Sequence, residues 1–304
     1  MALKICYVAK HGNGFNDDEG AVAHALRMLG HEVFCLPEQP ARQTWDWPKA
    51  DLTLFNKWGD AEAIRQAPGA KAFWFWDLVD FPDPLLERRN ATRRRWMEQV
   101  LPLVDLGFCT DGDWAAQYPE KLVWLPQGAD ERVAGKGEAK GPGPDILFFG
   151  STYKCGSGRE SFVADLKARY RGRFRWLDSG PSRPGIYGRA LADVIAGAKV
   201  VVAPDAPVLP SYWSNRVYVA LGYGAFLIHP YCAALASQYE DGKEILFYES
   251  REHLHRLIGW WLESDDRSRR EVAAAGLART LREHTYRHRV QTLLGVVRER
   301  LGIG

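Results

Sequence analysis

The sequence predicts an α/β protein built from two doubly wound parallel sheets. Short strand-like runs alternate with helical patterns along nearly all of the 304 residues, and these runs are apolar throughout rather than at every second position. Continuous apolar runs are typical of parallel strands that helices cover on both faces. A segment rich in Gly and Pro interrupts the alternation, so we expect two such domains facing one another across a cleft.

The domain boundaries follow from this alternation. Strand and helix patterns run from "LKICYVAK" at 3–10 to "KLVWLPQGAD" at 121–130, and they restart at "ILFFGS" after the segment "GKGEAKGPGPD". We therefore predict an N-terminal domain at 1–134, a linker at 135–145 and a C-terminal domain at 146–304. The last helix is a candidate to cross back to the N-terminal domain.

Composition excludes several classes of protein. The 40 basic residues nearly balance the 38 acidic ones, so net charge alone predicts neither a nucleic-acid nor a membrane partner. The five Cys are widely spread without a CxxC pair, which argues against structural zinc and disulfides. No apolar run is long enough to span a bilayer, and the N-terminus lacks the pattern of a signal peptide, so we expect a cytoplasmic protein.

A first candidate site is the stretch "FFGSTYKCGSGRESF" at 148–162. Glycines and small hydroxyl residues follow an apolar strand and precede a helix, as in loops whose backbone amides cradle phosphate. The stretch is neither a Walker loop nor GxGxxG. Lys154 and Arg159 could neutralise a diphosphate, although two solvated basic residues near a turn would look the same.

A second candidate is "SYWSNRVYVALGYGAFLIHPY" at 211–231, which predicts a helix at 212–221 and then a buried strand. A Ser211 or Ser214 cap would expose amides at the helix start, and Arg216 adds a fork suited to phosphate. One helix face is expected to carry Asn215, Tyr218 or Val219, and Gly222. The alternative is that Arg216 pairs with an acidic residue and the aromatic residues pack in the core.

Acidic and imidazole groups follow several predicted strands, where a general base would be expected. The principal candidates are Asp17, Asp18, Asp77 and His11, and the others are Glu19, Asp80, Asp111, Asp205 and His229. Each of these acids could equally be a helix cap or a solvated loop residue. The basic cluster "ERRNATRRRW" at 87–96 could contact a polyanion such as DNA, or form a solvated helix face.

The C-terminal motifs resemble group 1 glycosyltransferases, in the branch similar to the spore-maturation proteins. The resemblance rests on "SNRVYVALGYGAFLIHPY", "QYEDGKEILFYES" and "AAAGLARTLREHTYRHRVQTLL", which occur in the family's order over residues 146–295. It implies two Rossmann-like lobes of the GT-B type: an acceptor lobe at the N-terminus and a nucleotide-sugar lobe at the C-terminus, with no required metal or cofactor.

The resemblance also implies residue roles. Gly150, Ser151 and Arg159 would meet the donor diphosphate, and the Arg216 helix would add phosphate contacts. Many relatives carry two glutamates eight residues apart, where this chain has Ser211 and Val219. Asn215 and Tyr218 are therefore the substitute candidates for binding the ribose, and the sequence leaves open whether the reaction retains or inverts configuration.

The sequence thus predicts a glycosyltransferase that moves a sugar from a nucleotide donor, such as a UDP-sugar, to a hydroxyl acceptor. Two acceptor classes stay open: a glycan or small molecule, and a hydroxymethylated base in DNA of the phage type. Two other functions are considered, a nucleotide-sugar-binding protein without transfer activity and a nucleotide-sugar epimerase. The sequence does not specify the sugar, the nucleotide base or the oligomeric state.

Overall fold

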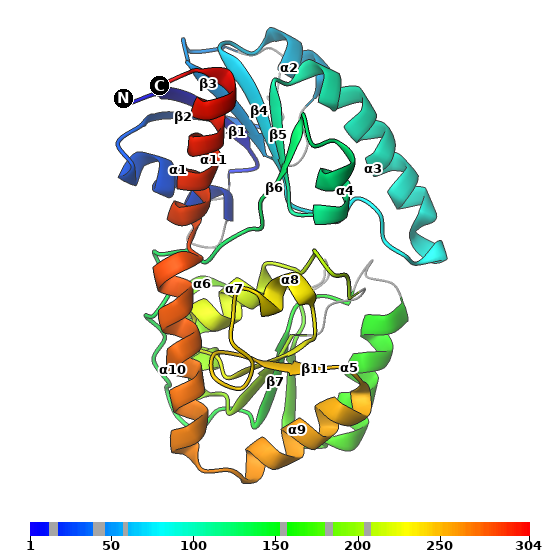
Figure 1. Ribbon diagram of the computed structural model, residues 1–304. Helices are drawn as coiled ribbons and strands as arrows, with labels where there is room; N and C mark the ends of the chain where they lie inside the picture. Colours follow the sequence, from blue (N-terminus) through cyan, green and yellow to red (C-terminus); the bar gives the residue numbers. More distant parts are fainter. Residues whose placement is uncertain (12–17, 39–45, 57–59, 153–156, 180–184, 204–207) are drawn as a thin grey trace. The chain divides into compact units, whose positions relative to one another are not determined.

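The computed structural model describes residues 1–11, 18–38, 46–56, 60–152, 157–179, 185–203 and 208–304. The predicted Lys154, Asp17 and Asp205 lie outside these residues. The chain divides into two units: unit 1 comprises 1–81, 87–127 and 286–304, and unit 2 comprises 82–86 and 128–285. Each unit is a parallel sheet with helices (Figure 1).

Among the described residues, unit 1 has a six-stranded sheet in the order β2-β1-β3-β4-β5-β6. All of its strand pairs are parallel. The strands are β1 (Lys4–Ala9), β2 (Glu32–Pro37), β3 (Leu52–Asn56), β4 (Ala70–Phe75), β5 (Leu106–Cys109) and β6 (Leu122–Trp124). The helices are α1 (Asp18–Met28), α2 (Ala61–Gln66), α3 (Glu87–Val100), α4 (Gly112–Gln117) and α11 (Tyr286–Leu301), with a 3-10 turn at Leu101–Leu103.

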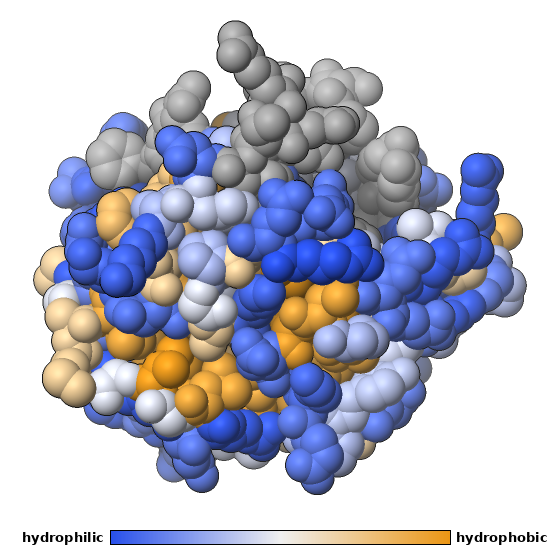
Figure 2. Space-filling view, turned by 90° about the horizontal axis from the view of Figure 1, so that it is seen from above, coloured by the Kyte–Doolittle hydropathy of each residue, from blue (hydrophilic) through white to orange (hydrophobic). Residues whose placement is uncertain are grey.

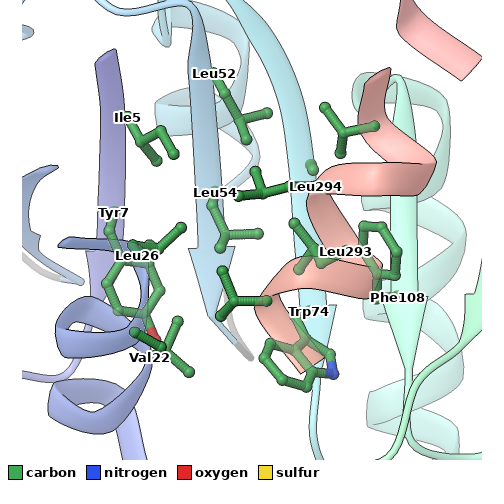
Figure 3. Close-up of a cluster of buried hydrophobic side chains, with 14 of the residues drawn as sticks. Ile5, Tyr7, Val22, Leu26, Leu52, Leu54, Trp74, Phe108, Leu293 and Leu294 are labelled. Atoms are coloured by element: carbon green, nitrogen blue, oxygen red, sulfur yellow. The ribbon is translucent and has the colours of Figure 1, made fainter. Parts of the chain in front are cut away.

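The helices α1 and α11 cover one face of this sheet, although they are far apart in the sequence. Val22 and Leu26 of α1 and Leu293 of α11 pack with the strands in one buried cluster (Figure 3). A second cluster on the other face takes buried residues from α2, α3 and α4. Helices on both faces explain why the strands are apolar throughout.

Unit 2 has a five-stranded parallel sheet in the order β11-β10-β9-β7-β8 within the described residues. Its strands are β7 (Ile146–Phe149), β8 (Phe174–Leu177), β9 (Val200–Val202), β10 (Leu227–Pro230) and β11 (Leu246–Tyr248). Its helices are α5 (Ser157–Arg169), α6 (Gly188–Gly197), α7 (Arg216–Gly222), α8 (Ala233–Ala236), α9 (Arg251–Glu263) and α10 (Asp266–Glu283), with a 3-10 turn at Pro84–Leu86. The predicted pair of doubly wound parallel sheets is confirmed.

The segment interpreted as a linker, 135–145, packs inside unit 2. A Cβ atom on Gly137 would lie 2.5 Å from the carbonyl oxygen of Ala192, and one on Gly143 would lie 2.1 Å from that of Gly197. These glycines let the chain run directly against the backbone of α6. Close packing therefore accounts for glycines whose composition alone suggests a flexible linker.

Helix α7 begins at Arg216, four residues after the predicted start of the helix at 212. Leu209 and Tyr212 form an isolated bridge instead, and the Cys232 thiol lies 3.0 Å from the carbonyl oxygen of Leu209. Asn215 occupies the position before the helix and makes no side-chain capping bond. The expected Ser211 or Ser214 cap is thus not formed.

No helix of the described residues is long and apolar enough to cross a bilayer. The face in Figure 2 is largely hydrophilic, with hydrophobic patches among the hydrophilic residues. Exposed apolar surface of this kind is ordinary for globular proteins.

Two helix glycines of unit 2 give a matched test of packing. Gly276 in α10 would place a Cβ 2.3 Å from the carbonyl oxygen of Glu244, whereas Gly259 in α9 has nothing within 4 Å. We expect Gly276→Ala to lower the free energy of unfolding by about 1–3 kcal/mol through overpacking. Gly259→Ala should raise it by roughly 0.5–1 kcal/mol, because Ala favours helix. Urea unfolding measures both, and equal effects of the two changes would contradict this packing.

Candidate functional site

The strand order of unit 2 reverses between β7 and β9. The chain passes from β7 to β8 on one side, and β9 then pairs with β7 on the other side. Parallel α/β sheets bind ligands outside the carboxyl ends of the strands at such a reversal. The residues after β7 and those between β9 and α7 are therefore where a ligand site is expected.

Gly150 and Arg216 meet at this point. The Arg216 Nε donates to the carbonyl oxygen of Phe149 at 2.8 Å, and its Nη1 donates to the Ser214 hydroxyl at 3.1 Å. Gly150 has φ of +129°, and a Cβ there would lie 2.6 Å from the Arg216 Nη2. Only glycine therefore lets the guanidinium lie against the end of β7.

The next two carbonyl groups are also held by side chains. Trp176 of β8 donates its indole N–H to the carbonyl oxygen of Gly150 at 2.9 Å. Arg159 of α5 is 8% exposed, and its Nη1 donates to the carbonyl oxygen of Ser151 at 2.9 Å. Two fixed guanidinium groups thus flank residues 149–151, which makes this edge of the sheet positive and suited to an anion.

The other predicted donor residues divide into two groups. Ser214 takes part as the hydroxyl that orients Arg216, and Asn215 is half-buried directly before α7. Tyr218, in contrast, is fully buried, and its hydroxyl donates to the Gln238 Oε1 at 2.9 Å. Tyr218 is therefore a core residue of unit 2 in this structure, because its side chain is buried and its hydroxyl is paired with Gln238.

In unit 1 the strand order reverses between β1 and β3, and His11 follows β1. The imidazole Nε2 lies 3.1 Å from the carbonyl oxygen of Tyr7, and the Tyr7 ring meets the imidazole edge to face at 5.4 Å. A carbonyl can only accept a hydrogen bond, so in the neutral imidazole Nε2 carries the proton and Nδ1 carries the lone pair. His11 is half-buried and has the tautomer of a base at Nδ1.

Asp18 begins α1 and is held by residues that sequence reasoning did not select. Its carboxylate accepts from the Gln127 Nε2 at 3.3 Å, and the same amide donates to the Tyr286 hydroxyl at 3.3 Å. Burial, with the nearby Asp18 carboxylate as a lesser cause, raises the pKa of Tyr286 well above its usual value. The one sequence signal that could have pointed to Tyr286 is its place in the motif "HTYRHR".

Asp77 pairs with the basic helix α3. The Arg93 Nη2 lies 3.1 Å from the Asp77 carboxylate, and the Arg93 Nη1 donates to the carbonyl oxygen of Leu78. Arg94 in turn pairs with Asp80 and Glu87. Arg93 and Arg94 therefore hold the segment after β4, which gives part of the basic cluster at 87–96 a structural role.

Asp111 holds the same segment from the end of β5. Its carboxylate accepts from the backbone N–H of Val79 at 3.0 Å and from that of Trp114 at 3.1 Å. Burial raises the pKa of Asp111 to about 6, and the nearby Asp113 and Asp80 carboxylates add to the shift. The chain therefore spends folding free energy to keep this carboxylate ionised at neutral pH.

Two further features, His229 and a cavity in unit 2, supply no residue to the candidate site. His229 is 1% exposed, and its Nδ1 lies 2.8 Å from the carbonyl oxygen of Pro230, so it is an interior residue. A cavity of about 290 Å³ in unit 2 is lined by residues 140–144, Arg175 and α6, and contains none of the predicted site residues. Among the described residues no group of three or more His, Cys, Asp or Glu could hold a metal ion.

Comparison with known proteins supports the assignment of the second unit. Residues 157–295 match the model of a family described as glycosyl transferase-like, which covers less than half of the chain. The matched residues comprise most of unit 2 and the first part of α11 in unit 1. None of the curated protein sequences matches the chain.

Solved structures match nearly the whole chain at low identity. Sucrose-phosphate synthase from Thermosynechococcus elongatus has a TM-score of 0.66 at 12% identity, covering 98% of this chain and 99% of that one. HepE from Anabaena in complex with UDP-glucose has a TM-score of 0.62 at 11% identity, and the match covers 98% of this chain and 100% of that one. The chain therefore has the GT-B fold.

The same fold also occurs in a protein of another description. The N-terminal domain of trehalose-6-phosphate phosphatase from Candida albicans has a TM-score of 0.65 at 8% identity, with 99% of this chain and 97% of that one covered. Fold alone does not determine an activity, so the chemistry has to be argued from the site.

The raised pKa of Asp111 predicts a pH dependence of stability. The folded state holds the proton to about pH 6, whereas the unfolded state releases it near 3.8, so the folded state binds more protons between these values. The contribution of the Asp111 carboxyl group to the free energy of unfolding is therefore largest at low pH and decreases as the pH rises. The free energy of unfolding of the wild type relative to Asp111→Asn should fall by about 2 kcal/mol from pH 4 to pH 7.

Urea unfolding of both proteins across this range measures the difference. A difference that stays constant would show that the Asp111 carboxyl group titrates normally in the folded protein.

Proposed function

We propose that this protein transfers a sugar from a UDP-sugar to a hydroxyl acceptor and that unit 2 binds the donor diphosphate at the carboxyl end of β7. One observation carries the proposal: the Arg216 and Arg159 guanidinium groups are fixed on the carbonyl oxygens of Phe149 and Ser151, at the reversal of strand order. The family match over 157–295 and the UDP-glucose bound to HepE support the choice of ligand.

The proposed reaction needs charge to be stabilised on the departing nucleotide. The bond between the anomeric carbon and the diphosphate oxygen breaks, and a bond from the anomeric carbon to the acceptor oxygen forms. Negative charge collects on the diphosphate as it leaves, and preorganised cations lower the energy of that state most. Arg216 and Arg159 supply two such charges from this chain, so the proposed transfer requires no metal ion.

The acceptor hydroxyl must lose its proton in this reaction, and we assign that step to unit 1. His11 is the candidate base because its Nε2 is committed to the carbonyl oxygen of Tyr7, which leaves the lone pair on Nδ1. Asp77 is a weaker candidate, since Arg93 already pairs with its carboxylate. Asp18 is engaged by Gln127.

Two finer assignments belong to the same proposal. We place unit 2 in the branch similar to the spore-maturation proteins because "SNRVYVALGYGAFLIHPY" and "HTYRHR" follow one another in that order. We favour a glycan or small-molecule acceptor over DNA, because Arg93 and Arg94 of the basic helix are held in ion pairs inside unit 1.

Binding of UDP tests the donor site. Arg216→Ala and Arg159→Ala should each weaken UDP binding by about 10- to 100-fold, because each removes a charge-assisted contact with phosphate. Arg216→Lys should weaken it too, since an ammonium group cannot keep the contacts with both Phe149 and Ser214. Isothermal titration calorimetry measures the dissociation constant.

Arg256→Ala is the matched control, because Arg256 is an exposed arginine of unit 2 that pairs only with Glu252 among the contacts described for it. Circular dichroism would verify that each variant is folded. If Arg216→Ala and Arg159→Ala both bound UDP as the wild type does, the donor site would lie elsewhere. Tight UDP binding without turnover of any sugar donor would instead indicate a binding protein.

Substitution of His11 tests the assigned base. His11→Ala should lower kcat by about 10²- to 10⁴-fold, the usual contribution of a general base. Its UDP affinity should not change, because the proposed donor site lies in unit 2. The control is His24→Gln in α1, a half-buried histidine to which no role is assigned. An unchanged kcat in His11→Ala would exclude His11 as the base.

A further inference from the structure

Asn56 is a polar residue in the apolar sheet of unit 1. It ends β3, where it lies opposite Trp74 of β4, and only 3% of its surface is exposed. Strand β3 flanks the reversal of strand order between β1 and β3. Asn56 therefore stands at the position of this sheet where ligands are expected.

Neither polar atom of the Asn56 side chain has a hydrogen-bond partner within the described part of the chain. Burying an amide without partners costs free energy, and buried side-chain polar atoms are nearly always paired. A second buried asparagine shows the usual case: Asn90 is also 3% exposed, and its amide donates to and accepts from the backbone of Phe81 at 2.7 and 3.1 Å. The Asn56 amide thus has hydrogen-bonding capacity that the described residues leave unused.

Thr110 is a second buried polar residue whose side chain has no hydrogen-bond partner among the described residues. It directly follows β5 and is 4% exposed. Side chains alternate along a strand, so Asn56 shares a face with Leu52 and Leu54, and Thr110 shares a face with Phe108. These leucines and Phe108 belong to the cluster that packs against α1 and α11 (Figure 3).

Trp74, which lies opposite Asn56 on the neighbouring strand, belongs to a group of buried aromatic rings. The Trp74 and Trp76 rings meet edge to face at 5.4 Å, and Trp76 contacts Tyr286 at 6.0 Å. Amide and hydroxyl groups both donate and accept hydrogen bonds, as sugar hydroxyl groups do. Binding of a nucleic-acid backbone would instead need cations, which Asn56 and Thr110 do not supply.

We propose that Asn56 binds one hydroxyl group of a sugar acceptor at the carboxyl edge of the unit 1 sheet, and that Thr110, two strands away, binds another. The inference rests on the proposed function and adds to it the chemical class of the acceptor. The amide of Asn56 donates to the hydroxyl oxygen and accepts from the hydroxyl proton, which satisfies both unpaired atoms at once.

Stability gives a readout that needs no acceptor. Asn56→Leu replaces an unpaired amide by an apolar group of similar shape, so the apparent Tm should rise by about 2–4 °C. Asn90→Leu is the matched control and should lower the apparent Tm, because it leaves the Phe81 backbone groups unpaired. A fall in Tm for Asn56→Leu like that for Asn90→Leu would overturn the proposal, since the amide would then have a partner in the protein.

Transfer gives the second readout, with UDP-glucose as donor and a panel of p-nitrophenyl glycosides as acceptors. Asn56→Leu should lower kcat/KM for the acceptor by roughly tenfold or more, mainly through KM, and Thr110→Val should lower it less. UDP affinity, measured by calorimetry, should be that of the wild type. Wild-type transfer kinetics in Asn56→Leu would overturn the proposal even if its Tm rose.

The outcomes separate this inference from the proposed function. A wild type that does not bind UDP would refute the donor site in unit 2. A wild type that binds UDP but glycosylates none of the panel would refute a sugar acceptor and leave the donor site standing. Transfer only to duplex DNA containing 5-hydroxymethylcytosine would likewise overturn the sugar class.

Discussion

Three consecutive backbone carbonyl groups, those of Phe149, Gly150 and Ser151, are each held by a side chain from a different element of unit 2. Arg216 comes from the start of α7, Trp176 from β8 and Arg159 from α5. The segment is therefore fixed before any ligand arrives, and its two cations are fixed with it. Preorganisation of this kind lets electrostatic stabilisation act without the cost of rearrangement during a reaction.

Most of the fold was predictable because it follows from patterns that are local in the sequence. Continuous apolar runs between helical patterns predict parallel sheets, and the two sheets have that form. The start of α7 was less predictable, because the bridge between Leu209 and Tyr212 depends on contacts with Cys232, a residue from a later segment. The glycines of 135–145 were ambiguous, since flexibility and close packing against α6 favour the same residue.

The candidate site was predictable only where residue type and chain position agree. Gly150, Arg159 and Arg216 could be selected because a glycine after a strand and nearby arginines suit phosphate. Asp77 also follows a strand. Its partner Arg93, however, lies on a helix whose orientation the sequence does not reveal. Asn56 could not be found at all, because its significance lies in partners that are missing, and only coordinates show them.

The position of α11 constrains how the chain acquires its structure during synthesis. Unit 1 contains residues 1–81, 87–127 and 286–304, so its core is incomplete until Leu293, Leu294 and Val297 have been made. All of unit 2 leaves the ribosome before these residues do. The core of the N-terminal sheet therefore stays incomplete, with this apolar face covered only in part by α1, while the later unit is already able to fold. The order of folding is in this respect the reverse of the order of translation.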